Sequence, residues 1–462
     1  MKKQFIKNTF ELTATALLTR TMGLIFRAYM TNKLGSSGIG LYSIIIMVYG
    51  FFVTVTVSSF NLVSTRLITD SFAEQKPSKA LYYLRCCILL CVCVATVMGA
   101  ILFFGANIVA NLILNDARCV LSLKILALSL PFVGLSSCFR GYFFSRRKAG
   151  FTATEQILEQ VVEFAVFAAL IDNMLPRGVE YACASVVIGT LLGEIVSAIY
   201  TVILYIYDEH LLRAKATKCK GFLKQYLNIG LPVTASSCLR SGMSMVETSM
   251  IPTGLTKYGA NRDKSLAQYG EIVGLAMPIL TFPDLFLSAF TTLMIPEMSD
   301  AKAQKRVNGI KYMAQKVLGA TYIFSVIIMV VFYYFGELIG LAIFGKENVG
   351  IYVKILAPLI PLWYIDRVAD GMLKGLGEQV FYLAYNIIDS VIRVVLTIIL
   401  LPKFGVMGVI VMLYVSAILN LGFSTSRLVK IAKIELKLKK LILPPLVAVL
   451  VCKILSVLIF LV

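Results

Sequence analysis

The sequence predicts an all-α integral membrane protein with about 13 transmembrane helices, arranged as two six-helix lobes and one extra C-terminal helix. Three observations predict this class: the composition, the recurrence of long apolar stretches, and an internal repeat. Of the 462 residues, 58% are hydrophobic and 15% are charged, and the mean hydropathy is +0.84. A soluble domain is about 45–50% apolar and about 25% charged, so most of this chain must face lipid or other membrane helices.

Apolar stretches that could cross about 30 Å of hydrocarbon, which takes about 20 helical residues, recur along the whole chain. The first stretch contains Arg20 and Arg27 and lacks a small-residue cleavage site, so it is expected to be a retained span. The connections are short and leave no room for an extramembrane domain. The predicted spans are 9–30, 38–64, 81–105, 120–144, 151–171, 179–207, 222–250, 269–295, 311–335, 351–373, 379–401, 405–429 and 441–461.

Lys and Arg outnumber Asp and Glu by 44 to 25, which gives a net charge of +19. In a soluble protein this excess would suggest nucleic acid as a partner, but here the basic residues gather in alternate loops. The N-terminus and the loops after even-numbered spans hold most of them, and the opposite loops hold few. The positive-inside rule therefore predicts a multi-pass protein of the cell membrane with a cytoplasmic N-terminus and Val462 outside.

Motifs for catalysis, metals or nucleotides are missing from the sequence. The single histidine, His210, lies in a charged loop, and most of the ten cysteines lie inside apolar spans, where they are small packing residues. The segment Gly340–Glu347 fits GxxxxGK, but Glu347 replaces the required Ser or Thr and a membrane helix precedes it. We therefore expect no enzyme, no cofactor, no nucleotide and no nucleic acid, although Na⁺ or H⁺ could couple to transport.

An internal repeat is the most informative feature of the sequence. The segment KILALSLP at 124–131 recurs as KILAPLIP at 354–361, and the same offset pairs Gly40 with Gly270 and Gly141 with Gly371. Six helices per repeat is an even number, so both copies enter the membrane from the same side. This parallel repeat predicts an N-terminal lobe at 1–210, a C-terminal lobe at 211–432 and an additional membrane helix at 433–462.

Arginines inside membrane spans are costly, by about 2.5–3.5 kcal/mol at a helix centre, so each requires an explanation. Arg20 and Arg27 are seven residues apart on one face of the first span, and Arg240 and Glu247 are seven apart in the seventh. The arginines either line a water-filled cavity and hold phosphate, or pair with acids on neighbouring helices. Arg140, at the cytoplasmic end of its span, is expected to snorkel toward the interface.

Acidic residues mark the fifth span and its repeat partner. Glu155, Glu159 and Glu163 follow one another at intervals of four on one helical face, and the repeat aligns the last two with Asp389 and Arg393. An Asp and an Arg four residues apart can neutralise each other. The carboxylates are candidate cation or proton sites, counter-ions for the arginines, or partners in a buried network, and the sequence leaves these alternatives open.

Four local patterns together resemble the multidrug/oligosaccharidyl-lipid/polysaccharide flippase superfamily, and within it the branch of stage V sporulation protein B and the peptidoglycan-precursor flippases. They are LTRTMGLIFR (18–27), LGSSGIGLYS (34–43), FNLVSTRLITDSFAEQ (60–75) and FTTLMIPEMSDAKAQ (290–304). The resemblance implies twelve core helices in two lobes, alternating access, and an undecaprenyl-pyrophosphate-linked sugar as substrate. It also implies cavity-facing cations, matched here by Arg20, Arg27 and Arg240. Such flippases often have fourteen spans, whereas this sequence has one clear span after the twelfth.

We therefore expect a flippase for a lipid-linked oligosaccharide, such as a peptidoglycan precursor or a polysaccharide repeat unit. A cation-coupled multidrug exporter of the same fold is the alternative, and a membrane-embedded glycosyltransferase is a third. The net charge of the cavity distinguishes the flippase from the exporter, because organic cations need an acidic cavity and a pyrophosphate needs a basic one.

Overall fold

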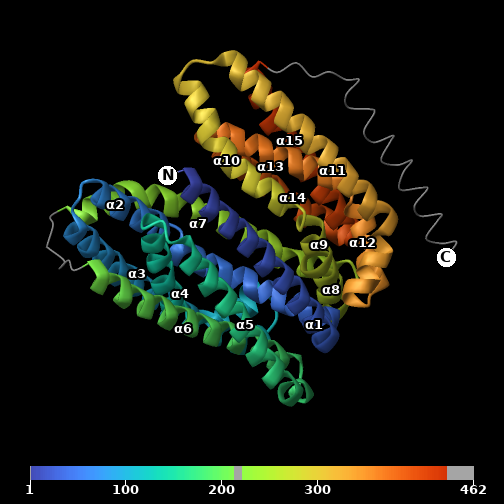
Figure 1. Cartoon of the computed structure of the whole chain (residues 1–462). Helices are drawn as coiled ribbons and strands as arrows, with labels where there is room; N and C mark the ends of the chain where they lie inside the picture. The colour runs from blue at the N-terminus through green and yellow to red at the C-terminus, as the bar shows by residue number, and fades with distance from the viewer. Residues whose placement is uncertain (1, 213–220, 434–462) are drawn as a thin grey trace. The chain divides into compact units, whose positions relative to one another are not determined.

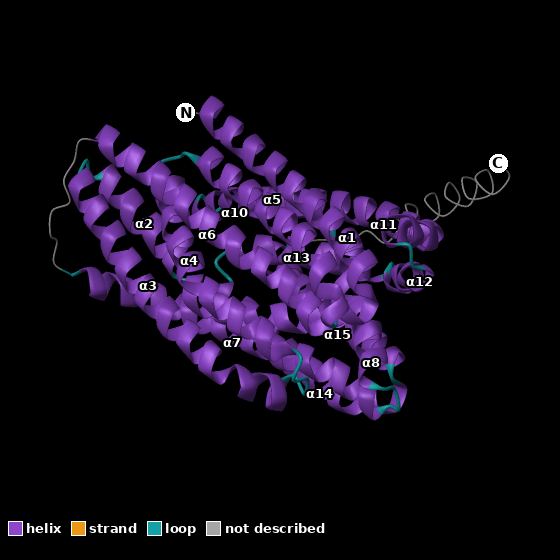
Figure 2. Cartoon of the chain, turned by 90° about the horizontal axis from the view of Figure 1, so that it is seen from below, coloured by secondary structure: helices purple, strands orange, loops and turns teal. Residues whose placement is uncertain are grey.

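A computed structural model describes residues 2–212 and 221–433, and every regular element in these two ranges is helical (Figure 2). In chain order they are α1 (Lys2–Val57), α2 (Phe60–Ala73), α3 (Pro77–Ile108), η1 (Val109–Ile113), α4 (Cys119–Ser145), α5 (Ala149–Met174), η2 (Leu175–Arg177), α6 (Val179–Leu212), α7 (Phe222–Lys257), α8 (Arg262–Tyr269), η3 (Gly270–Ala276), α9 (Met277–Thr281), α10 (Asp284–Ala303), α11 (Val307–Phe344), α12 (Glu347–Leu356), α13 (Leu359–Gly375), α14 (Gln379–Phe404) and α15 (Val406–Ala432). The predicted all-α class is confirmed.

Helix α1 covers the predicted span 9–30 and most of the predicted span 38–64, whose last residues fall in α2. Its 56 residues would extend about 84 Å at about 1.5 Å per residue, far beyond the thickness of a bilayer core. The helix breaks at Gly35, where φ is 71° and ψ is 177°. Glycine adopts this conformation readily because it has no Cβ. The break separates the predicted spans 9–30 and 38–64.

The chain divides by internal packing into two compact units, Met1–Ser249 and Met250–Val462. This boundary falls inside α7, whereas the predicted lobes divide at 210–211. In the first unit α4 packs against α1, α2, α3 and α6, and Figure 1 shows α3, α4 and α6 alongside one another. In the second unit α13 packs against α10, α11 and α15, and α14 packs against α15.

Backbone features recur between the two units at the offset of the sequence repeat. Helices α3 and α11 begin at equivalent positions of the repeat, as do α5 and α14, and α2 and α10 end at equivalent positions. Close helix contacts recur as well: a Cβ on Gly141 would lie 2.8 Å from the Asn61 carbonyl oxygen, and one on Gly371 would lie 1.9 Å from Thr291 Cγ2. Left-handed residues recur in the pairs Gln75 and Lys305, Asn115 and Gly345, and Arg147 and Gly377.

Six helical segments of the described ranges are long and apolar enough to cross a membrane, and the pair α12 and α13, bent by 58°, makes a seventh. The chain is thus a multi-pass membrane protein, and the count of thirteen spans stays a prediction. The predicted span 269–295 is not one continuous helix, because it falls on α8, η3, α9 and α10. Pro278 is the second residue of α9 and Pro283 is the N-cap of α10, as expected where prolines interrupt a helix. The predicted span 441–461 lies outside the described residues.

Candidate functional site

Arg20 and Arg240, two of the predicted phosphate ligands, both belong to the first unit. Arg20 lies in the first half of α1 and Arg240 lies in α7, and both residues are exposed. Within residues 2–212 and 221–433, no hydrogen bond or ion pair is formed by either guanidinium group. Both side chains are therefore available to an external anion in this structure.

Arg27 has a different environment, because the first half of α1 packs along α5. The ring of Phe26 lies 5.7 Å from that of Phe164 and 5.5 Å from that of Phe167, measured between centroids. Arg27 is half-buried, and its charge acts on Glu163 of α5. The structure thus brings Arg27 and Glu163 together, as the counter-ion interpretation predicts for this arginine.

A buried polar network joins α4, α5 and α6 in the first unit. The side chain of Glu155 is fully buried, and its Oε1 accepts hydrogen bonds from Arg140 Nε at 3.1 Å and from the Ser197 hydroxyl at 2.5 Å. Arg140 Nη2 also lies 4.0 Å from Glu159 Oε2. The expectation that Arg140 snorkels to the interface is wrong, since its guanidinium turns inward to compensate a buried carboxylate that would otherwise be costly.

Two further carboxylates extend this network along α5 and α6. The Thr190 hydroxyl donates a hydrogen bond of 2.8 Å to Glu163. Glu194 is 7% exposed, and its Oε2 has no hydrogen-bond partner within the described part of the chain. Sequence analysis missed Glu194, although an acid in the middle of the apolar stretch 179–207 is itself a signal of a functional site.

The other predicted ion-site residues are distributed over both units. Glu247 of α7 is 3% exposed, and Asp389 of α14 is 6% exposed. Oδ1 of Asp389 has no hydrogen-bond partner among the residues that the structure describes. Arg393 is half-buried, and the ion pair expected between Asp389 and Arg393 stays a prediction.

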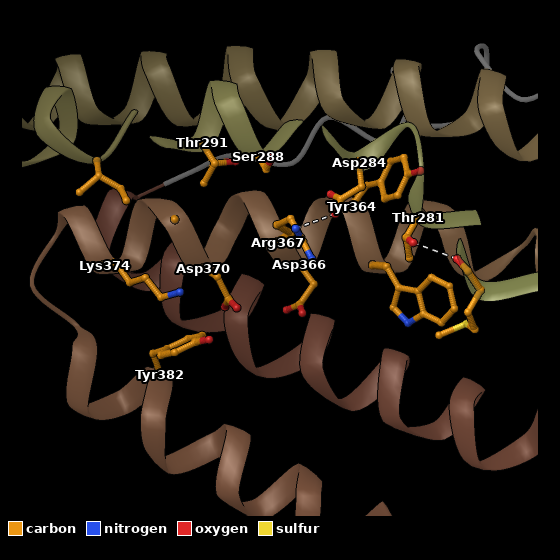
Figure 3. A pocket seen from close by; sticks show the side chains of 14 residues that line it. Thr281, Asp284, Ser288, Thr291, Tyr364, Asp366, Arg367, Asp370, Lys374 and Tyr382 are labelled. Carbon is orange, nitrogen blue, oxygen red and sulfur yellow. Dashed lines mark hydrogen bonds and ion pairs between the residues drawn. The ribbon is translucent and has the colours of Figure 1, made fainter. Parts of the chain in front are cut away.

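The second unit contains a cavity of about 510 Å³ that sequence analysis did not predict (Figure 3). It lies among α9, α10, α13 and the start of α14. Its lining residues are Met277, Thr281, Asp284, Ser288, Thr291, Ile295, Trp363, Tyr364, Asp366, Arg367, Asp370, Gly371, Lys374 and Tyr382.

Charged groups in this cavity have specific partners within the second unit. Arg367 Nη1 lies 2.6 Å from Asp284 Oδ2. Asp366 accepts a hydrogen bond of 2.6 Å from the Ser424 hydroxyl, and Asp370 accepts one from the Tyr385 hydroxyl. The cavity can therefore recognise a charged or polar group.

Comparison with known proteins identifies families and relatives that are similar to this chain. The sequence profile of the family described as polysaccharide biosynthesis protein matches residues 5–301, and that of the MatE family matches residues 232–399. Stage V sporulation protein B of Bacillus subtilis (strain 168) is 24% identical over 449 residues, which cover 95% of this chain and 86% of that protein. Lipid II flippase MurJ of the same organism is 22% identical over 215 residues, or 43% of this chain and 40% of MurJ.

Solved structures with the same fold include two transporters. Lipid II flippase MurJ in an inward closed conformation superposes with a TM-score of 0.74 at 16% identity, covering 96% of this chain and 92% of that one. A multidrug resistance MATE family transporter of the MOP superfamily, in its inward-facing conformation, gives a TM-score of 0.72 at 12% identity, covering 90% of this chain and 96% of that one.

The relatives and structural neighbours whose names state an activity are flippases or transporters. The chain is accordingly a membrane transporter or flippase and not an enzyme, so the glycosyltransferase alternative is wrong. The family profile covers residues 5–301 of 462, well over half of the chain. This protein therefore belongs to the polysaccharide biosynthesis protein family.

Proposed function

We propose that this protein flips an undecaprenyl-pyrophosphate-linked saccharide across the cell membrane by alternating access. The observation that carries the proposal is that Arg20 and Arg240 are exposed and form no ion pair within the described residues, although both lie in predicted membrane spans. An arginine in a span is stable where it faces a water-filled path or an anion. The planar guanidinium group matches phosphate oxygens through paired hydrogen bonds.

The surrounding carboxylates support the phosphate interpretation over the counter-ion interpretation for Arg20 and Arg240. Glu155 and Glu159 have Arg140 as their cationic partner, and Glu163 accepts a hydrogen bond from Thr190. These acids therefore have polar partners other than Arg20 and Arg240. Arg27 is less exposed than these two arginines, and its charge acts on Glu163. It could interact both with this carboxylate and with the pyrophosphate.

The proposal includes two six-helix lobes, thirteen spans and a cytoplasmic N-terminus. Helix boundaries and left-handed residues that share one offset between the two units support duplication of one lobe. Both copies of a six-helix unit enter a membrane from the same side, because six is an even number of spans.

A cation-coupled multidrug exporter is the second candidate, favoured by the carboxylates of the first unit. Glu155, Glu159, Glu163 and Glu194 outnumber the cations that act on them, Arg140 and Arg27. A site of this kind can take up Na⁺ or H⁺, and coupling of either ion is equally compatible with a flippase. The proposed coupling or counter-ion residues are Glu159, Glu163, Glu247, Asp389 and Arg393.

Binding of undecaprenyl pyrophosphate to the purified full chain, titrated by native mass spectrometry, tests the proposal. Arg20→Ala and Arg240→Ala should each weaken binding by roughly ten- to a hundredfold, since a hydrogen bond to a charged group contributes about 1.5–3 kcal/mol. Arg20→Lys should restore part of the lost affinity, because lysine keeps the positive charge but lacks the planar guanidinium group that makes paired hydrogen bonds. Arg177→Ala, which removes an exposed arginine from η2, is the matched control and should bind as the unsubstituted protein does. Unchanged affinity in both alanine variants contradicts the proposal.

A further inference from the structure

Two acidic side chains of α13 enter the cavity of the second unit from adjacent helical turns. Asp366 and Asp370 are four residues apart, and Figure 3 shows their carboxylates on the same side of α13 as Lys374 and Tyr382. Each accepts one hydrogen bond, from Ser424 and Tyr385 respectively. A carboxylate accepts about four hydrogen bonds, so both retain capacity for a further donor.

The charges that line the cavity do not balance. Arg367 is neutralised by Asp284 at 2.6 Å, which removes one charge of each sign. Among the lining residues, Asp366 and Asp370 then face a single cation, Lys374. One negative charge remains in a partly enclosed space, and it requires an additional cation or a proton.

Size and lining favour an organic cation over a bare metal ion. The cavity volume of about 510 Å³ far exceeds the roughly 30 Å³ that one water molecule occupies in the liquid. In the described ranges, no three Asp, Glu, His or Cys side chains form a group that could hold a metal ion. Trp363 and Tyr382 also line the cavity, and the face of an aromatic ring attracts an ammonium group.

Lys374 shows that an ammonium group fits this environment. Its Nζ lies 3.8 Å from the centroid of the Tyr382 ring. A ligand ammonium would meet the same kinds of group, a carboxylate and an aromatic face. Arg367, which also lines the cavity, has a side chain that is 51% exposed.

We propose that Asp366 and Asp370 bind a primary ammonium group carried by the head group of the transported molecule. This inference rests on the proposed function, in which the substrate is a lipid-linked saccharide, and adds that the saccharide or its substituent bears a free amine. The cavity would then select between head groups that differ in this amine, because a missing ammonium leaves a negative charge of the cavity unpaired.

Trp363 is the only tryptophan in the chain and lines the cavity, so its fluorescence reports on binding. Ethylammonium chloride, titrated into the purified full chain at constant ionic strength, should change this fluorescence saturably, whereas NaCl should not. Asp366→Asn with Asp370→Asn should weaken the response tenfold or more. Asp300→Asn, an exposed site on α10 outside the cavity, is the matched control and should leave it unchanged.

Lys374→Gln gives a test that misfolding cannot imitate. Removing the resident ammonium leaves two unbalanced carboxylates, so ethylammonium should bind severalfold more tightly than to the unsubstituted protein. The proposal is overturned if NaCl produces the same saturable change, which indicates an inorganic cation site, or if the double Asn variant retains full affinity. It is also overturned if Lys374→Gln binds no more tightly.

Transport in proteoliposomes separates this inference from the proposed function. Two undecaprenyl-pyrophosphate-linked saccharides are compared, one with a free amine and one with that amine acetylated. Asp366→Asn should slow flipping of the free amine tenfold or more and leave the acetylated lipid unaffected, while Arg20→Ala should slow both. If the unsubstituted protein flips neither lipid, the proposed function fails; if it flips both and Asp366→Asn keeps their ratio unchanged, only the ammonium site fails.

Discussion

Arg140 Nε lies 3.1 Å from Oε1 of Glu155, and this contact ties α4 to α5 at a carboxylate that has no exposed surface. Ser197 of α6 donates to the same oxygen at 2.5 Å. Three helices of the first unit therefore meet at one buried charge. Removing its cation should cost far more than removing an exposed ion pair.

Arg140→Ala should lower the free energy of unfolding by about 3–5 kcal/mol, because it strands Glu155 as a buried charge. Adding Glu155→Gln to Arg140→Ala should recover part of the loss, since the neutral amide can remain buried. Circular dichroism during heating of the purified variants measures both effects. Arg85→Ala, which removes one partner of the exposed pair with Glu209, is the control and should change Tm little. An Arg140→Ala variant that melts with the unsubstituted protein would show that the contact does not stabilise the first unit.

Gly141→Ala should destabilise the contact between α2 and α4. Its Cβ would lie 2.8 Å from the Asn61 carbonyl oxygen, which is backbone and cannot move without shifting α2. Overpacking of this kind costs about 1–3 kcal/mol. Gly319→Ala provides the control, because its Cβ would meet nothing within 4 Å, and alanine there should be neutral or slightly stabilising. Equal melting temperatures for the two variants would argue against this close approach.

The helical membrane class could be predicted from sequence because it depends on local composition and length. The division of 269–295 into several helices depends on backbone conformation at single residues, which hydropathy does not encode. Pro278 and Pro283 lie where this division falls.

The polar networks show the limit of sequence analysis more clearly. Arg140 and Glu155 belong to different helices, and only packing decides whether the arginine turns inward or toward the interface. Asp366 and Asp370 carry the same signal as Glu155 and Glu159, two acids four residues apart in a predicted span, and that signal could have identified them. Lys374 follows Asp370 at the next interval of four, but its contact with the ring of Tyr382 becomes apparent only when α13 and α14 are placed together.

Topology provides a separate prediction from the loop charges. A reporter fused after Lys220 follows six predicted spans and should be cytoplasmic, like the N-terminus. A reporter fused after Val462 follows thirteen predicted spans and should be extracellular. Alkaline phosphatase and green fluorescent protein fusions at both positions measure this directly. Activity of both fusions on the same side would mean that the count is wrong by one, most plainly in the segment 441–461.

Flipping by Arg20→Ala and Arg240→Ala in proteoliposomes, with the thermal stability of the same purified proteins, tests the central claim most directly. If these arginines hold the pyrophosphate, each variant should keep its Tm and lose roughly ten- to a hundredfold of the flipping rate for an undecaprenyl-pyrophosphate-linked saccharide. Arg20→Lys should recover part of that rate. Flipping that survives both alanine substitutions, or a loss of transport that merely follows a loss of stability, would contradict the account.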